Sequence, residues 1–440
     1  MEFLTTPTQY SHIGYPLIFW YGCAIIGLIL IFIRPWWAFL FSVFCLSARN
    51  FHAAVFTRTP FFGPYMNLND LLIWISLLGI IFVVLKKEKI YIPKILIAIF
   101  IILIIGNLQS LVNYGLIEEV LRRIWQPAIF PLTFLISANM VKDERKACLF
   151  YWTLYFGALT AVLQHMIFLG NALYSGTQMR TISYISSGGL FLLIGGIFES
   201  PFKKSDVFRN ILYYTGLTLI GISYILSLTR GIYVAGLCTL IIINFFIIKK
   251  AKIKKVFNVV ILAILVIFLN KIFFPQLDII NIVRERFKSF VYPETFNEAY
   301  QSRLIGSQTE IDIWLDSPII LGVGNVLPYE IGYKGYDPET GALYHVAYST
   351  YLAHYGIIGL LIYAILLPYL TIKVAMKLYR EHLFQYCKII GLIGVAISLF
   401  SIFSLPWSYH FLGATSHIDG LIYGAVWGLY NKERNNGRIT

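Results

Sequence analysis

The residues of this sequence best suited to chemistry are three arginines and a histidine at the ends of apolar runs: Arg180, Arg230, Arg303 and His345. A guanidinium binds phosphate oxygens through two parallel hydrogen bonds and stays charged when partly buried. A neutral imidazole near physiological pH accepts a proton from a hydroxyl group. Grouped together, these side chains would bind a phosphate or diphosphate and activate a hydroxyl nucleophile.

Three of these residues also have ordinary structural explanations. Arg180 could extend along a helix end to a membrane surface. Arg303 could pair with Glu310 or Asp312 on an exposed helix. A lone histidine such as His345 is more often an interfacial residue than a catalyst. Position alone therefore leaves both interpretations open for these three.

Arg230 is harder to explain structurally. It lies in LSLTRGIYVAG, a tight connection between two apolar runs. An unpaired charge at that depth costs several kcal/mol unless it is hydrated or bound to a partner. It also lies on the side of the membrane where basic residues are disfavoured. We therefore expect a functional role for Arg230.

The elements that position these residues are membrane-spanning helices. Hydrophobic residues make up 58% of the 440-residue chain and charged residues only 13%, against roughly 25% in soluble proteins. Mean hydropathy is +0.72. The apolar runs are long and continuous, which excludes the short alternating strands of an outer-membrane barrel. The sequence thus predicts an all-α polytopic integral membrane protein, because a helix satisfies its own backbone groups in lipid.

About 12 or 13 spans are expected on a roughly 20-residue criterion. The apolar runs lie near 15–33, 36–50, 68–86, 91–108, 123–141, 147–169, 183–199, 209–228, 231–248, 255–274, 349–375, 386–405 and 410–430. Because the N-terminus lacks the charged region of a cleavable signal, we expect the first span to stay. Whether the first two runs form one re-entrant unit is left open.

Basic clusters between the runs set the orientation. KKEK, KKSDVFR and KKAKIKK are typical of cytoplasmic loops. The cytoplasmic segments are then 86–89, 142–146, 201–209, 249–255, 373–388 and the C-terminal tail. All four candidate residues fall on the outer side, which predicts a site facing away from the cytoplasm.

We expect three regions along the chain. Residues 1–274 form an N-terminal bundle of about ten spans, 275–348 a large extracytoplasmic loop, and 349–440 the C-terminal spans and a short cytoplasmic tail. In the loop, 279–290 is a basic amphipathic helix suited to a lipid interface. A second helix at about 302–315 precedes the turn DSP and the glycine-bearing LGVGN.

Several kinds of chemistry are not indicated. The sequence has no P-loop, no HExxH, no CxxC and no close acidic pair in the outer loops. The five cysteines lie in or beside apolar runs, so neither a disulfide framework nor a zinc site is predicted. We expect no cofactor, no metal and no nucleic-acid partner, and any reaction must take its energy from the substrate.

Three segments together resemble the superfamily of O-antigen polymerases and O-antigen ligases. LSLTRGIYVAGLCTL resembles its arginine-bearing hairpin, and SRLIGSQTEIDIWLDSPIILGVGN is similar to its loop signature. HVAYSTYLAHYGIIGLLIY resembles the segment in which a histidine precedes a glycine by eleven residues, here His345 and Gly356. RTISYISSGG resembles, less closely, the family's arginine-bearing loop before a span. The resemblance covers about 175–430, and departs from the family at Val346 (often asparagine) and His354 (often glutamate).

This resemblance implies a glycosyltransferase of surface polysaccharide biosynthesis in the bacterial cytoplasmic (inner) membrane. Its donor would be a glycan on undecaprenyl diphosphate, and its acceptor another glycan or lipid A–core. Other polysaccharide-assembly proteins are possible partners. The expected reaction is polymerisation of lipid-linked repeat units; ligation to lipid A–core and, from another class, a polytopic transporter are the alternatives.

The implied site has His345 as base and Arg230 as a catalytic residue. Arg180, Arg230 and Arg303 bind the diphosphate and stabilise the charge that develops on it. The rival carboxylates for the base are Asp312, Asp316, Asp337 and Glu339, and tyrosines of the loop could stack on sugar rings, namely Tyr329, Tyr333 and in particular Tyr336 and Tyr344. For any one tyrosine, packing is the more usual role.

Overall fold

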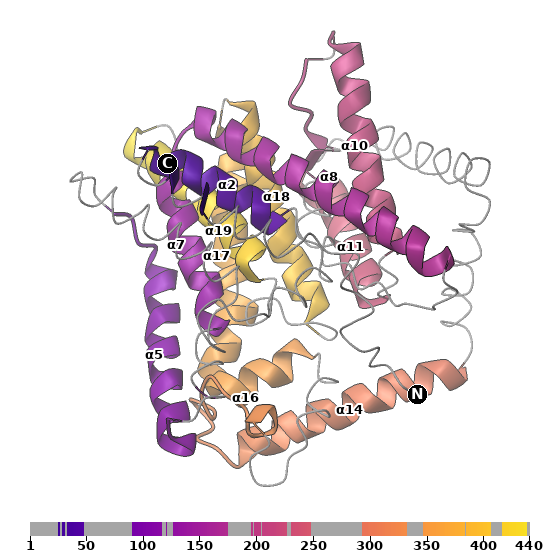
Figure 1. The fold of residues 1–440 in the computed structure, drawn as a ribbon. Coiled ribbons are helices and arrows are strands. Elements are labelled where there is room, and N and C mark those ends of the chain that lie inside the picture. The colour runs from indigo at the N-terminus through magenta and orange to yellow at the C-terminus, as the bar shows by residue number, and fades with distance from the viewer. Residues whose placement is uncertain are drawn as a thin grey trace.

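The structure is a computed structural model of the 440-residue chain. The described residues are 25–26, 29–30, 33–47, 90–116, 120, 126–174, 195–196, 198–203, 205–226, 230–247, 293–331, 346–382, 384–405 and 416–437. All regular structure in these residues is helical, with no strand among them. The predicted all-α class is confirmed (Figure 1).

Three of the described helices are long and apolar enough to cross a membrane: Lys94–Tyr114, Ala347–Glu381 and Gln385–Ser404. The first is α5 and the third is α18. The second is continuous through α16 (Ala347–Leu360), the π-helix η6 (Leu361–Leu366) and α17 (Leu367–Glu381). The runs predicted near 91–108, 349–375 and 386–405 are therefore helices, and the chain is a multi-pass membrane protein.

The remaining described helices fill in the bundle. They are α2 (Pro35–Ser47), η2 (Gln126–Ala128), α7 (Ile129–Met140), α8 (Glu144–Tyr174), α10 (Val207–Leu226), α11 (Arg230–Ile242), the π-helix η3 (Ile243–Ile247), α14 (Pro293–Leu315), η4 (Pro328–Ile331) and α19 (Ser416–Asn435). The runs predicted near 147–169, 209–228, 231–248 and 410–430 thus lie largely in helices. Those near 68–86 and 255–274, and the amphipathic stretch 279–290, lie outside the described residues.

Helices α7 and α19 pack closely together, and the glycines of α19 recur every four residues. Gly420, Gly424 and Gly428 lie against the backbone of α7. A Cβ on Gly424 would come within 2.7 Å of the Cβ of Ser137 and closer still to the carbonyl oxygen of Phe134. Small residues at this spacing let two helix backbones approach closely. Close packing of this kind holds helices together in a membrane, because the hydrophobic effect does not drive helix association in lipid.

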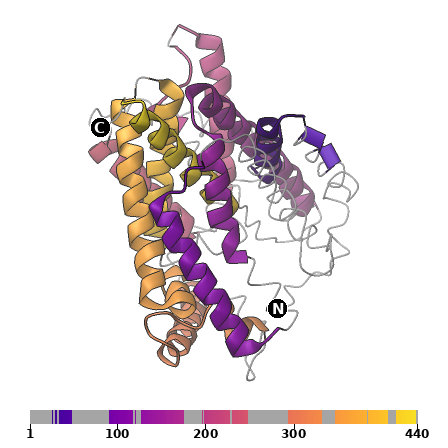
Figure 2. The same ribbon diagram turned by 90° about the vertical axis from the view of Figure 1, so that its left-hand side faces the viewer.

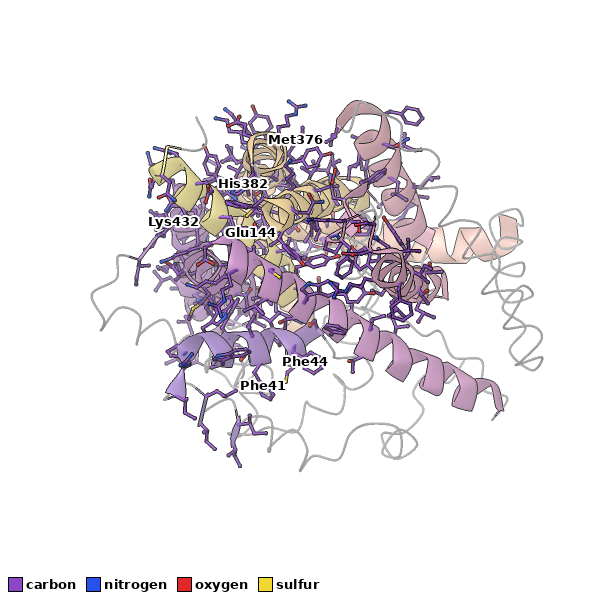
Figure 3. All side chains as sticks on the ribbon, turned by 90° about the horizontal axis from the view of Figure 1, so that it is seen from above. Phe41, Phe44, Glu144, Met376, His382 and Lys432 are labelled. Atoms are coloured by element: carbon purple, nitrogen blue, oxygen red, sulfur yellow. The ribbon has the colours of Figure 1, made fainter. Side chains whose placement is uncertain are left out.

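One end of the bundle gathers the segments predicted to be cytoplasmic. The carboxylate of Glu144, at the start of α8, accepts hydrogen bonds from the amide of Tyr386 and the thiol of Cys387. The carboxylate of Glu199 accepts a hydrogen bond from the side-chain amide of Gln385. The Nε2 of His382 lies 3.3 Å from the Oε2 of Glu433. Figure 3 looks down on this end, where Glu144, His382 and Lys432 lie near one another. The basic loops at 142–146, 201–209 and 373–388 thus meet at one end, as the predicted topology requires.

The opposite end is built by α14, α16 and the loop between them. In Figure 1, α14 lies across the lower end of the molecule and α5 runs down to meet it. Figure 2 shows the same end, with α5 and the long α16–α17 helix side by side above α14. The helix predicted over 302–315 is confirmed and begins earlier, at Pro293, where a proline needs no backbone hydrogen bond. All the described parts of the predicted outer loop lie here.

Candidate functional site

Gly322 and Gly324, in the turn after α14, allow the chain to lie directly on two helices. Both have positive φ, 68° and 109°. A Cβ on Gly322 would lie 2.5 Å from the carbonyl oxygen of Ala353, and one on Gly324 would lie 2.6 Å from the Oγ of Ser110. Glycine is required for the backbone conformation and for the close approach. The GVG sequence therefore forms a contact between α16 on one side and α5 on the other.

On the α5 side, the turn is bound by polar residues of α5. The amide of Asn325 donates to the carbonyl of Gly106 (3.2 Å), and its Nδ2 donates to the carbonyl of Leu103 (3.1 Å). The amide of Val326 donates to the Oγ of Ser110 at 3.1 Å. Two of the acceptors are backbone carbonyls of α5, and the third is the hydroxyl of the buried Ser110. The turn is thus anchored to a helix about 220 residues earlier in the chain.

On the α16 side, the helix is interrupted to receive the turn. Gly356 has φ 61° and ψ −155°, a conformation that only glycine adopts readily. The break frees the amides of Ile357 and Ile358, which donate to the carbonyls of Ile319 and Ile320 at 3.2 and 3.3 Å. The backbone groups lost by the helix are satisfied by the turn, so the break and the turn depend on each other.

The buried face of α14 points toward α16. Its buried residues recur at helical spacing, namely Gly306, Ser307, Glu310 and Ile313. Arg303 precedes Glu310 by seven residues, about two helical turns, and so occupies the same face of the helix. Glu310 is only 1% exposed. A carboxylate on the buried side of a helix is rare and needs hydrogen-bond donors around it.

Three hydroxyl groups supply those donors. The hydroxyl of Tyr329 donates to Glu310 Oε1 at 3.0 Å, and that of Thr350 donates to the same oxygen at 3.0 Å. Ser349 donates to Oε2 through a short hydrogen bond. The donors come from two elements, η4 and α16. The carboxylate therefore joins α14 to the loop and to the first turn of α16.

The first turn of α16 is held at two further points. Val346, the N-cap, contributes no side-chain hydrogen bond. Instead, its carbonyl lies within hydrogen-bond distance of the hydroxyls of Ser349 and Thr350. The amide of Ala347 donates to the carbonyl of Leu405 at the end of α18 (3.0 Å). The residue that precedes this turn in the chain is His345.

Helix α14, the turn after it and α16 lie within one stretch of the chain that matches a known family. Residues 215–364 match the model of a family described as O-antigen ligase. Residues 215–364 form an O-antigen ligase family domain. No curated protein matches the chain.

The O-antigen ligase family domain begins within α10 and ends in the π-helix η6. It contains Arg230, Arg303 and His345, whereas Arg180 lies before it. Arg230 is the first residue of α11 and Arg303 lies in α14; the side chains of both are outside what the structure describes. Arg180, His345, Tyr336 and Tyr344 lie outside the described residues.

His354, the second histidine of the family domain, has a structural role. His354 is 6% exposed, and its Nδ1 lies 2.8 Å from the carbonyl of Gly324. Because a carbonyl only accepts, Nδ1 carries the hydrogen in this contact. This chain therefore uses an imidazole N–H to bind the turn.

Two carboxylates considered as the base lie apart from this buried face. Asp312 and Asp316 are exposed on α14 and just after it, and Asp312 accepts a hydrogen bond from Gln308. Tyr329 is buried with its hydroxyl on Glu310, so it packs in the scaffold. Asp337, Glu339 and Tyr333 are among the residues that the structure does not describe.

The residue that sequence reasoning missed is Glu310. It was considered only as a possible partner for Arg303, and that pairing stays untested. The sequence did contain an indication of its burial. Glu310 lies at helical spacing from Gly306, which is small, and from Ile313, which is apolar. A lone carboxylate in such a stripe indicates a buried acid rather than a solvated one.

Proposed function

We propose that this protein is a glycosyltransferase of surface polysaccharide biosynthesis that polymerises repeat units carried on undecaprenyl diphosphate. The observation that carries the proposal is the O-antigen ligase family domain over residues 215–364. That family implies a membrane enzyme that transfers glycans from lipid-linked substrates. The reaction would take place at the outer face of the cytoplasmic membrane.

The proposed binding residues are arginines because the leaving group is a diphosphate. Arg180, Arg230 and Arg303 would hold its oxygens and stabilise the negative charge that grows as the glycosidic bond breaks. Arg230 begins α11 and Arg303 lies on the face of α14 that carries Glu310. Both belong to helices, which hold a charged group more rigidly than a free loop would.

The proposed base is His345. Its imidazole would take the proton from a sugar hydroxyl while the hydroxyl oxygen bonds to the anomeric carbon of the donor. The bond from that carbon to the diphosphate breaks, and in-line attack inverts the configuration. The first turn of α16, which begins two residues after His345, is fixed to α14 and α18. That fixation supports a positioned base at this point of the chain.

Ligation of a finished glycan to lipid A–core is the second candidate, because the description of the matched family is O-antigen ligase. The two reactions share the donor and differ only in the acceptor. Deletion of the gene separates them. Accumulation of single lipid-linked repeat units indicates a polymerase, whereas accumulation of long lipid-linked chains indicates a ligase.

The proposal is tested with purified protein, a polyprenyl-diphosphate glycan and no ion gradient. Chain growth under these conditions identifies a transferase, and its absence together with gradient-driven uptake would identify a transporter. His345→Ala should lower the rate by roughly 100- to 10,000-fold with an unchanged melting temperature. Near-normal transfer by that variant would remove His345 from the mechanism.

A further inference from the structure

The network around Glu310 joins three parts of the family domain through one side chain. Its two carboxyl oxygens accept from Tyr329 and Thr350 at 3.0 Å and from Ser349. Tyr329 lies 19 residues after Glu310 in the chain, and Thr350 lies 40 residues after it. The carboxylate therefore links α14 to the first turn of α16 through polar contacts.

The position of the carboxylate suits the end of α16 that it contacts. Ser349 and Thr350 are the third and fourth residues of α16, within the first turn, where the helix dipole places partial positive charge. An anion is stabilised there, and hydrogen bonds to an ionised carboxylate are stronger than those between neutral groups. Each hydroxyl has a single proton, and the Val346 carbonyl competes for it. A charged acceptor draws that proton toward α14.

We infer that Glu310 is a positioning residue, which fixes the start of α16 against the face of α14 that also carries Arg303. This inference rests on the proposed function, in which His345, two residues before α16, is the base. The peptide bond between His345 and Val346 transmits the placement of the first turn to His345, since adjacent Cα atoms are held about 3.8 Å apart. Glu310 thus sets the base relative to a diphosphate-binding arginine without taking part in the chemistry.

The test compares Glu310→Gln with Glu381→Gln in the full-length protein. Glu381 is an exposed glutamate at the end of α17, so the same chemical change is made far from α14. Amide hydrogen exchange of residues 349–353 reports on the start of α16 whether or not the protein is active. We expect exchange there to be at least tenfold faster in Glu310→Gln and unchanged in Glu381→Gln.

Kinetics then separate positioning from folding and from direct catalysis. We expect kcat to fall roughly 10- to 100-fold, because a base displaced by about 1 Å loses rate on that scale. The KM for the donor and the midpoint of the acidic limb of the pH profile should not change. Loss of that limb would make Glu310 the base itself and overturn the inference.

Two further results would overturn it. One is unchanged exchange in Glu310→Gln, and the other is faster exchange with an unchanged kcat. If the wild-type protein transfers no glycan, the proposed function fails, whereas exchange still decides whether Glu310 holds α16. Should Glu310→Gln not accumulate, Tyr329→Phe removes one donor, and it must raise exchange in the same direction.

Discussion

Gly324 and His354 bind each other twice. The amide of Gly324 donates to the carbonyl of His354 at 2.9 Å, and the Nδ1 of His354 donates to the carbonyl of Gly324 at 2.8 Å. One of these bonds uses the backbone of α16 and the other uses the side chain of His354. The pair fastens the loop turn to α16 two residues before the helix breaks at Gly356.

Replacing His354 should therefore affect stability rather than chemistry. His354→Ala leaves the Gly324 carbonyl buried without its side-chain donor, which costs about 1–3 kcal/mol. We expect a lower melting temperature in detergent and a pH profile of transfer with the wild-type midpoint. His354→Gln, which restores an N–H donor, should recover part of the stability. An inactive His354→Ala protein with unchanged stability would contradict the scaffold role.

Gly356→Ala should disrupt the contact between α16 and the turn. Its Cβ would lie 2.5 Å from the carbonyl oxygen of Ile319, where the backbone of the turn cannot yield. The unfavourable backbone conformation adds about 1–3 kcal/mol to that clash. The melting temperature of Gly356→Ala in detergent measures the combined cost of the clash and of the backbone conformation.

Gly115→Ala is the matched control for Gly356→Ala. Gly115 also has positive φ, 77°, but nothing lies within 4 Å of its Cβ position. It carries the backbone cost without the clash, so its effect should be clearly smaller. Equal effects of the two substitutions would mean that the contact with Ile319 contributes nothing.

Gly424→Ala should destabilise the protein, although alanine is the better helix former. In an unhindered helix the change would stabilise by about 1 kcal/mol. Here the added methyl group would meet the α7 backbone at Phe134 and the side chain of Ser137. Forcing the two helices apart costs about 1–3 kcal/mol. A raised melting temperature would show that α7 and α19 do not pack as closely as described.

Arg230→Lys tests whether the proposed phosphate contact is bidentate. Lysine keeps the charge but loses the planar pair of donors. Loss of one charged hydrogen bond costs about 1.5–3 kcal/mol, so donor KM should rise roughly 10- to 100-fold. Arg209→Lys is the control, because Arg209 is exposed at the opposite end of the bundle. An unchanged donor KM in Arg230→Lys would argue against a bidentate contact.

Much of the architecture could be predicted because it is local. The apolar runs near 91–108, 349–375 and 386–405 become helices because backbone groups in lipid must bond within their own segment. The helix over 302–315 and the turn after it follow from helical spacing and from glycine and proline. The basic loops meet at one end because each span reverses the direction of the chain.

The sequence by itself thus determined the all-helical membrane class, the helices near 91–108, 349–375 and 386–405, and the meeting of the basic segments 142–146, 201–209 and 373–388 at one end. Only the tertiary structure decided what surrounds Glu310, since its donors lie 19 to 40 residues away. The same holds for the turn at Gly324, which rests on Ser110 of α5, and for the break at Gly356, which receives the carbonyls of that turn. Hydropathy and spacing report only which groups avoid water within one segment; which distant groups satisfy one another depends on how the helices pack.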